Sequence, residues 1–417
     1  MGQAGAALSH HRPTTAKQSF LTPRMVFFLA AIALTEATTA MTSVQVPVYL
    51  RWLGAEVAQV GLFFTLSAVV PLVLLVLGGW LSDALGRLRA ISLGSLSGVL
   101  AYTVFALAPN WRVALLSPAF AALAMALIRP SYRAYLADHS TPETRGRIFG
   151  SGETARNLTW IFGPPLGGLL AQNLGFRWLF AATSMAYAAA GLWILALASS
   201  DTRSKSTPMT ALTFSSLRSS VLHMASVIFS GGLITWLLIT DGVRDIAFKM
   251  SFDLMPVYLN DIWGLTRQQI GLMDGIFGIV LVLASYPAGW LADHTSERFC
   301  LVLGLGSVLT SRLVFVVASG FWGFAFSWSW LAVGVALMDP AIQSLISKGV
   351  PLQLRGMAYG LLATSWGLIS LPSPWIGGLL WTHLGPTAPF LATVALGSLT
   401  LLPAWFKLAV PKDSEVR

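Results

Sequence analysis

Ionisable residues lie inside long apolar stretches of this 417-residue chain, where they could bind a proton or a solute. Glu36 lies in the apolar stretch 25–47, which contains no basic residue, and Asp245 lies in 234–257. A charged side chain at the centre of a bilayer costs about 2.5–3.5 kcal/mol or more, so it is usually paired or functional. Desolvation favours the protonated form of an isolated carboxyl, which suits Glu36 to carrying a proton. We expect both carboxyls to bind a proton or a solute; the alternative is a carboxyl held by hydrogen bonds from a facing helix.

Further charges lie near Asp245 and on three other apolar stretches. Asp245 can pair with Lys249, because residues four apart share one face of a helix. Arg129 could pair with Asp339 as a gate between the first and second halves of the chain, or could bind an anionic solute together with Arg156. A static ion network is the alternative. The predicted site for solute and proton therefore consists of Glu36, Asp241, Arg244, Asp245, Arg129, Arg156 and Asp339.

The elements that position these residues must be membrane-spanning helices. Apolar residues make up 55% of the chain, charged residues only 10%, and the mean hydropathy is +0.70. Soluble domains carry about 25% charged residues, so this composition excludes an ordinary soluble enzyme, a disordered protein and a nucleic-acid-binding protein. A spanning helix needs about 20 mostly apolar residues. Twelve stretches qualify, near residues 25–47, 57–80, 90–108, 112–136, 148–171, 176–199, 234–257, 266–290, 299–318, 321–345, 355–380 and 386–407.

The distribution of polar segments predicts the domain organisation and the orientation. We expect a cytoplasmic N-terminal tail (1–24), a six-helix bundle (25–199), a cytoplasmic linker (200–233), a second six-helix bundle (234–407) and a cytoplasmic tail (408–417). With the N-terminus in the cytoplasm, 16 Lys and Arg residues lie on the cytoplasmic side. Five lie on the other side: Arg51, Arg112, Arg177, Arg267 and Arg312. This asymmetry predicts that both termini are cytoplasmic, in a multi-pass protein of the cytoplasmic membrane.

The two halves of the chain are copies of each other. The motif at 79–83 (GWLSD) recurs at 289–293 (GWLAD), and Pro164, Gly167 and Gly168 recur as Pro374, Gly377 and Gly378, all 210 residues later. The motif at 46–50 (VPVYL) recurs at 255–259 (MPVYL), 209 residues later, so the second copy has gained one residue. Asp245 is the counterpart of Glu36 at this offset. Two copies in the same orientation predict a cavity on the axis between them, as in an alternating-access transporter.

Two motifs resemble those of a known family. Residues 79–89 (GWLSDALGRLR) resemble the loop signature between helices 2 and 3 of the major facilitator superfamily, and the copy after residue 289 replaces Gly86 and Arg87 by Ser296 and Glu297. Residues 163–168 (GPPLGG) look like a helix-5 element that is frequent in exporters of this family. The resemblance implies an all-α membrane protein with twelve helices in two pseudo-symmetric six-helix bundles. It departs from the family's proton-coupled drug exporters at residues 113–128, where the expected arginine of helix 4 is missing.

The loop signature predicts a conformational latch. Asp83 can accept hydrogen bonds at the N-terminus of a neighbouring helix, which the resemblance identifies as helix 11. Arg87 can pair with Asp138 at the inner end of helix 4. An anchor that only fixes topology is the alternative. The predicted latch residues are Gly79, Asp83, Gly86, Arg87, Asp138 and Asp293.

These features favour a secondary transporter that uses a proton gradient to move a small organic solute, and the helix-5 element slightly favours efflux. A proton-coupled symporter that imports an organic or anionic solute is the main alternative. A membrane-embedded lipid-modifying enzyme, with Glu36 and Asp245 as acid and base, fits the duplication less well. A channel would leave the loop signature without a role. A single cysteine, Cys300, and the absence of clustered His ligands or a nucleotide-binding GxxxxGK[ST] motif predict no metal and no cofactor. We expect a small-molecule substrate, a proton as coupling ion, membrane lipids as surroundings, no nucleic acid, and a monomer that encloses its own pathway.

Overall fold

The structure, a computed structural model, describes residues 22–199, 232–349 and 367–408, and all regular elements in these ranges are helices. The N-terminal bundle contains α1 (Pro23–Ser43), α2 (Gln45–Trp52), α3 (Val57–Leu85), α4 (Arg87–Leu107), α5 (Trp111–Ala114), α6 (Ser117–Asp138), α7 (Arg145–Asn173) and α8 (Phe176–Ser199). The C-terminal bundle contains α10 (Leu233–Phe252), α11 (Met255–Val257), the π-helix η1 (Tyr258–Ile262), α12 (Arg267–His294), α13 (Glu297–Val317), α14 (Gly320–Gly349), α16 (Ser373–Leu384), α17 (Ala388–Ser398) and α18 (Leu401–Lys407).

The predicted all-α membrane fold is confirmed. Eight of the described helical segments are long and apolar enough to span a membrane. Each of the twelve predicted stretches coincides with one helix or with consecutive helices, although the stretch 355–380 is described only from residue 367 onward. The predicted tails 1–24 and 408–417 and the linker 200–233 lie almost wholly outside the described residues.

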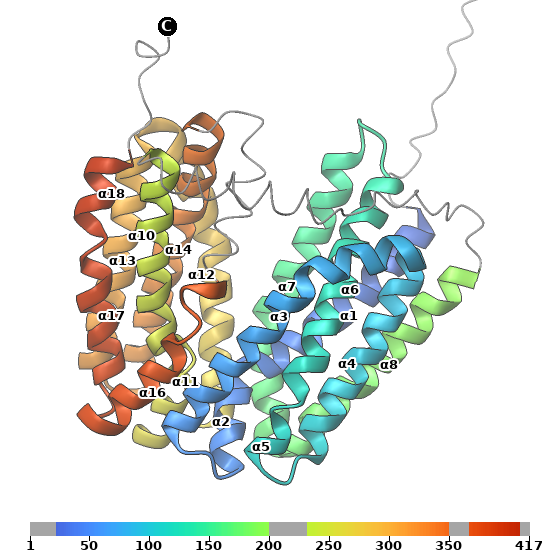
Figure 1. The fold of residues 1–417 in the computed structure, drawn as a ribbon, viewed down its shortest axis with the longest axis horizontal. Coiled ribbons are helices and arrows are strands. Elements are labelled where there is room, and N and C mark those ends of the chain that lie inside the picture. The colour runs from blue at the N-terminus through green and yellow to red at the C-terminus, as the bar shows by residue number, and fades with distance from the viewer. Residues whose placement is uncertain (1–21, 200–231, 350–366, 409–417) are drawn as a thin grey trace, which may run out of the picture.

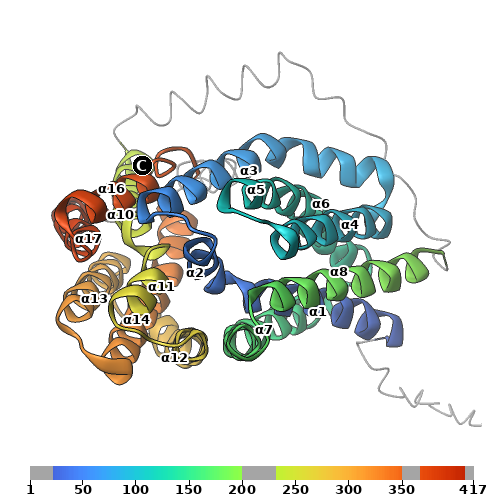
Figure 2. The same cartoon turned by 90° about the horizontal axis from the view of Figure 1, so that it is seen from below.

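The two bundles lean together at one end of the molecule and diverge toward the other (Figures 1 and 2). We call the first of these the contact end; it carries α2, α11, η1 and the first residues of α3 and α12. The turn between α3 and α4, the segment 139–144 and the turn between α12 and α13 lie at the opposite end. Helix α3 packs against α16, and α7 packs against α12, so two pairs of helices join the bundles.

Repeated glycines explain how closely these helix pairs approach. Gly61 of α3 faces the backbone of Pro374 in α16, and its repeat counterpart Gly271 of α12 faces the backbone of Pro164 in α7. A Cβ atom on Gly271 would lie 2.9 Å from the carbonyl carbon of Pro164, closer than ordinary contact allows. Small residues permit such close helix packing in membranes. The repeat of Pro164 and its following glycines therefore marks two equivalent contacts between the bundles.

At the contact end, α3 and α12 begin with the same capping arrangement. Glu56 caps α3, and the backbone N–H of Glu56 donates to Oε1 of Gln59 at 3.0 Å. Thr266 caps α12 in the same way with Gln269, at 2.9 Å. Each reciprocal capping box supplies partners for otherwise unpaired N–H groups of the first turn. The two helices that build the interface therefore start at equivalent positions of the repeat.

The π-helix η1 holds the residue that the second copy has gained. The offset between the copies is 209 up to Leu259, but 210 at Gly54 and Gly264. The extra residue thus lies between 259 and 264, where Tyr258–Ile262 forms η1. A π-turn is the usual way in which a helix accommodates one additional residue, and such turns are frequent at functional sites.

Candidate functional site

The most deeply buried ion pair of the predicted site lies on α10. Asp241 and Arg244 are 2.6 Å apart, with side-chain exposures of 2% and 20%. They line a small hollow with a volume of about 10 Å³, closed by side chains of α13 and α14 that include Leu305 and Met338. This volume is about the smallest that holds one water molecule. The pair thus lies within the C-terminal bundle, mostly among apolar side chains.

One turn further along α10, the predicted pair of Asp245 and Lys249 is confirmed at 3.2 Å. The Nζ atom of Lys249 also donates to Oγ of Ser370 at 2.8 Å. Ser370 precedes α16, which packs against α3 of the other bundle. Asp245 is therefore neutralised by a cation that also connects α10 to the segment leading into an interface helix.

Glu36 has different surroundings. Its half-buried side chain lies on α1, and no basic group of the described residues comes within 4.0 Å of it. Tyr102, Tyr132 and Tyr187 are near enough to interact with it electrostatically. The hydroxyl of Tyr187 is in turn 2.8 Å from that of Thr39. Glu36 therefore differs from Asp241 and Asp245, each of which forms an ion pair with a cation on its own helix.

The structure does not bring Arg129 and Asp339 together. Both side chains are exposed, and they form no ion pair with each other. Arg156 pairs with Glu153 on its own helix, with Nε and Nη2 at 2.9 and 2.5 Å from Oε2. All four residues lie in the parts of α6, α7 and α14 that run toward the end where the bundles diverge. A gate between the halves at these residues would require the bundles to approach at that end.

Part of the predicted latch can be described. Arg87 and Asp138 form the expected pair, with Nε 3.6 Å from Oδ2. Gly86 has φ +83°, a conformation that favours glycine, and it forms the turn between α3 and α4. Asp293 is exposed near the end of α12. Gly79 and Asp83 lie in α3, but the side-chain environment of Asp83 and the segment expected to receive it are outside the described residues.

The second copy of this pair has its charges exchanged. Glu297 and Lys348 lie 210 residues after Arg87 and Asp138, and they form an ion pair of 2.5 Å. The hydroxyl of Ser344 also donates to Glu297, at 3.0 Å. In the sequence, Glu297 stands where the first copy has the arginine of the loop signature. Applying the repeat offset to Asp138 as well as to Arg87 would have revealed the pair.

One arginine was placed wrongly from the sequence. Arg312 was assigned to the side opposite the cytoplasm, but it lies within α13 and is only 1% exposed. Its guanidinium carbon is 5.2 Å from the ring centre of Phe248 and 5.4 Å from that of Trp328. No described carboxylate lies within 4.0 Å, and its Nε and Nη2 atoms have no hydrogen-bond partner among the described residues. Aromatic faces therefore replace a counter-ion, and the indole N–H of Trp328 donates to Asp274 at 3.2 Å.

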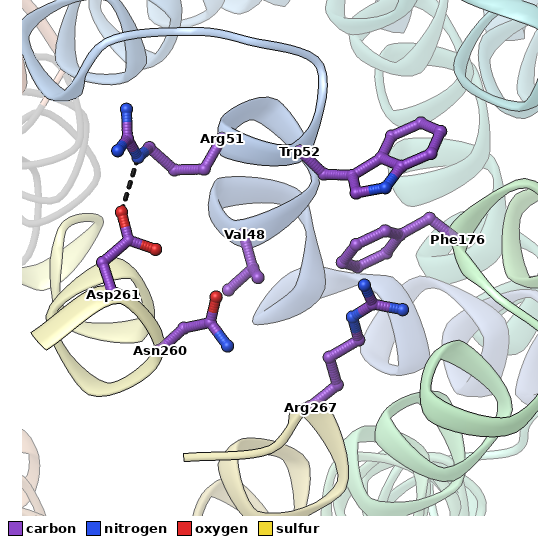
Figure 3. Close-up of a pocket in the computed structure, with 7 residues that line it drawn as sticks. All are labelled: Val48, Arg51, Trp52, Phe176, Asn260, Asp261 and Arg267. Atoms are coloured by element: carbon purple, nitrogen blue, oxygen red, sulfur yellow. Dashed lines mark hydrogen bonds and ion pairs between the residues drawn. The ribbon is translucent and has the colours of Figure 1, made fainter. Parts of the chain in front are cut away.

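A pocket of about 430 Å³ lies between the bundles at the contact end (Figure 3). Arg51 of α2 and Asp261 of η1 form an ion pair across it at 2.6 Å. The guanidinium of Arg267 lies 4.0 Å from the ring centre of Phe176 on its opposite side. Sequence analysis counted both arginines only as loop charges, since nothing in the sequence places α2 beside η1.

Comparisons with known proteins agree with this architecture. A family model described as Major Facilitator Superfamily matches residues 26–243 and 237–417. The chain is 26% identical over 367 residues to "Uncharacterized MFS-type transporter YqjV" of Bacillus subtilis (strain 168), covering 87% of this chain and 88% of the relative. It is 25% identical over 344 residues to the quinolone resistance protein NorA of Staphylococcus aureus (strain Mu50 / ATCC 700699), covering 80% and 84%.

Two solved structures share the fold at low sequence identity. A bacterial homologue of the iron transporter ferroportin, in an inward-facing state, has a TM-score of 0.75 at 16% identity and covers 93% of this chain and 98% of its own. A D-xylose–proton symporter has a TM-score of 0.68 at 13% identity and covers 93% and 97%.

Proposed function

The chain belongs to the Major Facilitator Superfamily, and we propose that it is a proton-coupled transporter that exports a small organic solute by alternating access. The observation that carries the proposal is Glu36, a half-buried carboxyl without a cation partner among the described residues. The similarity to NorA, whose name records quinolone resistance, and the GPPLGG element of α7 support export.

The coupling follows from the electrostatics of an unpaired carboxylate. An ionised carboxylate in apolar surroundings is unfavourable, and it becomes favourable when a proton or a cationic group neutralises it. If both compete for Glu36, the release of one accompanies the binding of the other. Asp241 and Asp245 already form ion pairs with Arg244 and Lys249, so their charges are compensated within the protein. This competition produces exchange of solute for proton.

Alternating access requires that the bundles separate at one end when they join at the other. With the predicted orientation, the contact end faces away from the cytoplasm, so the present arrangement is closed on that side. The exposed charges of Arg129, Arg156 and Asp339 lie toward the cytoplasmic side in this orientation. They would be the first groups that a cytoplasmic solute meets.

Import of an anionic solute together with a proton is the second candidate. It is favoured by Arg129, which is exposed and has no carboxylate within 4.0 Å among the described residues. In that case Arg129 binds the anion and Glu36 binds the proton. The two candidates differ in the charge of the solute and in the direction of its movement relative to the proton gradient.

Transport by the purified protein tests the proposal. A thermal-shift screen against cationic, zwitterionic and anionic solutes first identifies a solute, which is then followed in proteoliposomes with an imposed pH gradient. Glu36→Gln is expected to abolish gradient-driven movement of this solute, while Glu143→Gln, in the exposed loop 139–144, leaves it unchanged. Movement with the proton gradient rather than against it identifies the importer. Unchanged gradient-driven transport by Glu36→Gln refutes the coupling role.

A further inference from the structure

The contact end contains an ion pair between the bundles. Nε of Arg51 lies 2.6 Å from Oδ2 of Asp261, and the two side chains are 34% and 23% exposed (Figure 3). The pairs Arg87–Asp138 and Glu297–Lys348 each lie within one bundle, whereas this one joins α2 to η1. It therefore exists only while the bundles are together at this end.

The local backbone holds Arg51 ready for this contact. Its Nη1 atom donates to the carbonyl oxygen of Ala55 at 2.6 Å, so the guanidinium is fixed by its own bundle. Gly54, with φ +85°, allows the turn that brings this carbonyl back toward the end of α2. A guanidinium that is already oriented loses less freedom when it binds a carboxylate.

The residue gained by the second copy positions Asp261. The offset of the repeat changes from 209 to 210 between Leu259 and Gly264, and Asp261 lies inside the π-turn that accommodates the change. Adding a residue to a helix turns the following side chains by about 100° around its axis. The insertion thus sets the direction in which the acidic side chain leaves η1, toward Arg51.

We propose that Arg51 and Asp261, with the π-turn that positions the acid, form a charged latch that stabilises the state closed at the contact end. This inference rests on the proposed alternating access and assigns a residue pair to one of its states. Hydrogen bonds to backbone carbonyl groups lie beside the latch. Gln45 donates to the backbone carbonyl of Arg267 at 3.2 Å, and Arg267 donates to that of Ala171 at 2.8 Å. The ion pair differs from them because it joins two opposite charges, whose attraction is screened by salt, and the pocket beside it gives ions access.

Distances between spin labels measure the latch without any transport assay. The labels are placed on cysteines at Leu174 and Val317, which are 59% and 81% exposed and lie at the contact end of different bundles. Cys300, the single native cysteine, is replaced by alanine. The ratio of short to long distances then reports the fraction of molecules that are closed at this end.

Arg51→Gln and Asp261→Asn are each expected to raise the separated fraction relative to the closed one by roughly 1.5- to 5-fold, the range for partly exposed ion pairs. The double variant is expected to resemble either single variant, because one interaction is lost in each case. The exchanged pair Arg51→Asp with Asp261→Arg restores closure. Arg112→Gln is the matched control, since Arg112 is an exposed arginine at the same end that stacks on its neighbour Trp111. High salt is expected to shift the original chain as Arg51→Gln does.

The outcomes separate the latch from the proposed function. If Arg51→Gln, Arg112→Gln and the original chain all show both distances in the same ratio of short to long, the latch is overturned. Alternating access is not affected by that result. Additive effects of the two single variants also overturn it, because they show that the residues act separately. A single short distance in all variants and at all pH values overturns alternating access itself, and the latch with it.

Discussion

Adding one methyl group at the interface between α7 and α12 should disfavour the closed contact end. In Gly271→Ala, the new Cβ atom would lie 2.9 Å from the carbonyl carbon of Pro164 and 3.2 Å from Cα of Gly168. Both neighbours are backbone atoms, so no side-chain rotation can relieve the overlap. The carbonyl oxygen of Pro164 lies closer still, so the helices must move apart. Overpacking of this kind costs about 1–3 kcal/mol.

Because this overlap exists only while the bundles touch, the cost falls on the closed state. A difference of about 1–3 kcal/mol corresponds to a roughly 5- to 150-fold change in the ratio of closed to separated molecules. The spin-label pair at positions 174 and 317 measures this ratio directly. Gly61→Ala is expected to act in the same direction, because Gly61 faces Pro374 at the equivalent interface between α3 and α16.

Gly306→Ala is the control for the change in helix propensity. Gly306 lies within α13, and a Cβ atom there would meet nothing within 4 Å. Both substitutions gain about 1 kcal/mol of helix propensity, so their difference isolates the contact between the bundles. Equal distance distributions for Gly271→Ala and Gly306→Ala would refute the reasoning that backbone contact at this glycine limits closure.

Two further predictions concern charges within the C-terminal bundle. Glu297→Lys is expected to lower the melting temperature, because it places two cations together at the α13–α14 contact. Adding Lys348→Glu should recover most of the loss. No recovery would show that the ion pair at 2.5 Å contributes nothing to stability. Arg312→Met is expected to raise the melting temperature. It removes a fully buried cation, two of whose nitrogen atoms have no hydrogen-bond partner among the described residues, and such a charge costs about 2.5–3.5 kcal/mol in apolar surroundings. A lower melting temperature would show that the contacts with Phe248 and Trp328 outweigh that cost.

The residues that sequence analysis paired correctly are those whose geometry is fixed locally. Asp245 and Lys249 are one turn apart on the same helix, so helical periodicity alone brings them together. Arg87 and Asp138 begin and end neighbouring spans at one end of the bundle, so the topology restricts their separation. Both predictions needed no knowledge of how the bundles are placed relative to each other.

The pairs missed from the sequence join residues that are far apart in the chain. Glu297 and Lys348 could have been found, because the repeat maps a pair in the first bundle onto the second even when both charges are exchanged. Arg51 and Asp261 could not, because their contact requires the bundles to meet at one particular end. Arg312 lies only five residues before the end of α13, and the charge count assigns it to the loop that follows although the predicted stretch 299–318 contains it.

The repeat also shows how two copies of one scaffold have acquired different chemistry. Glu36 and Asp245 occupy equivalent positions on α1 and α10, and Tyr102 and Arg312 occupy equivalent positions on α4 and α13. In the N-terminal bundle, Glu36 is near enough to Tyr102 to interact with it electrostatically. In the C-terminal bundle, Asp245 forms an ion pair with Lys249. A nearby cation favours the ionised form of a carboxyl, and Glu36 has no such partner within 4.0 Å among the described residues. On the proposed mechanism, proton exchange therefore takes place in the N-terminal bundle. The ion pairs of the C-terminal bundle give a charged solute different electrostatic surroundings in the two halves.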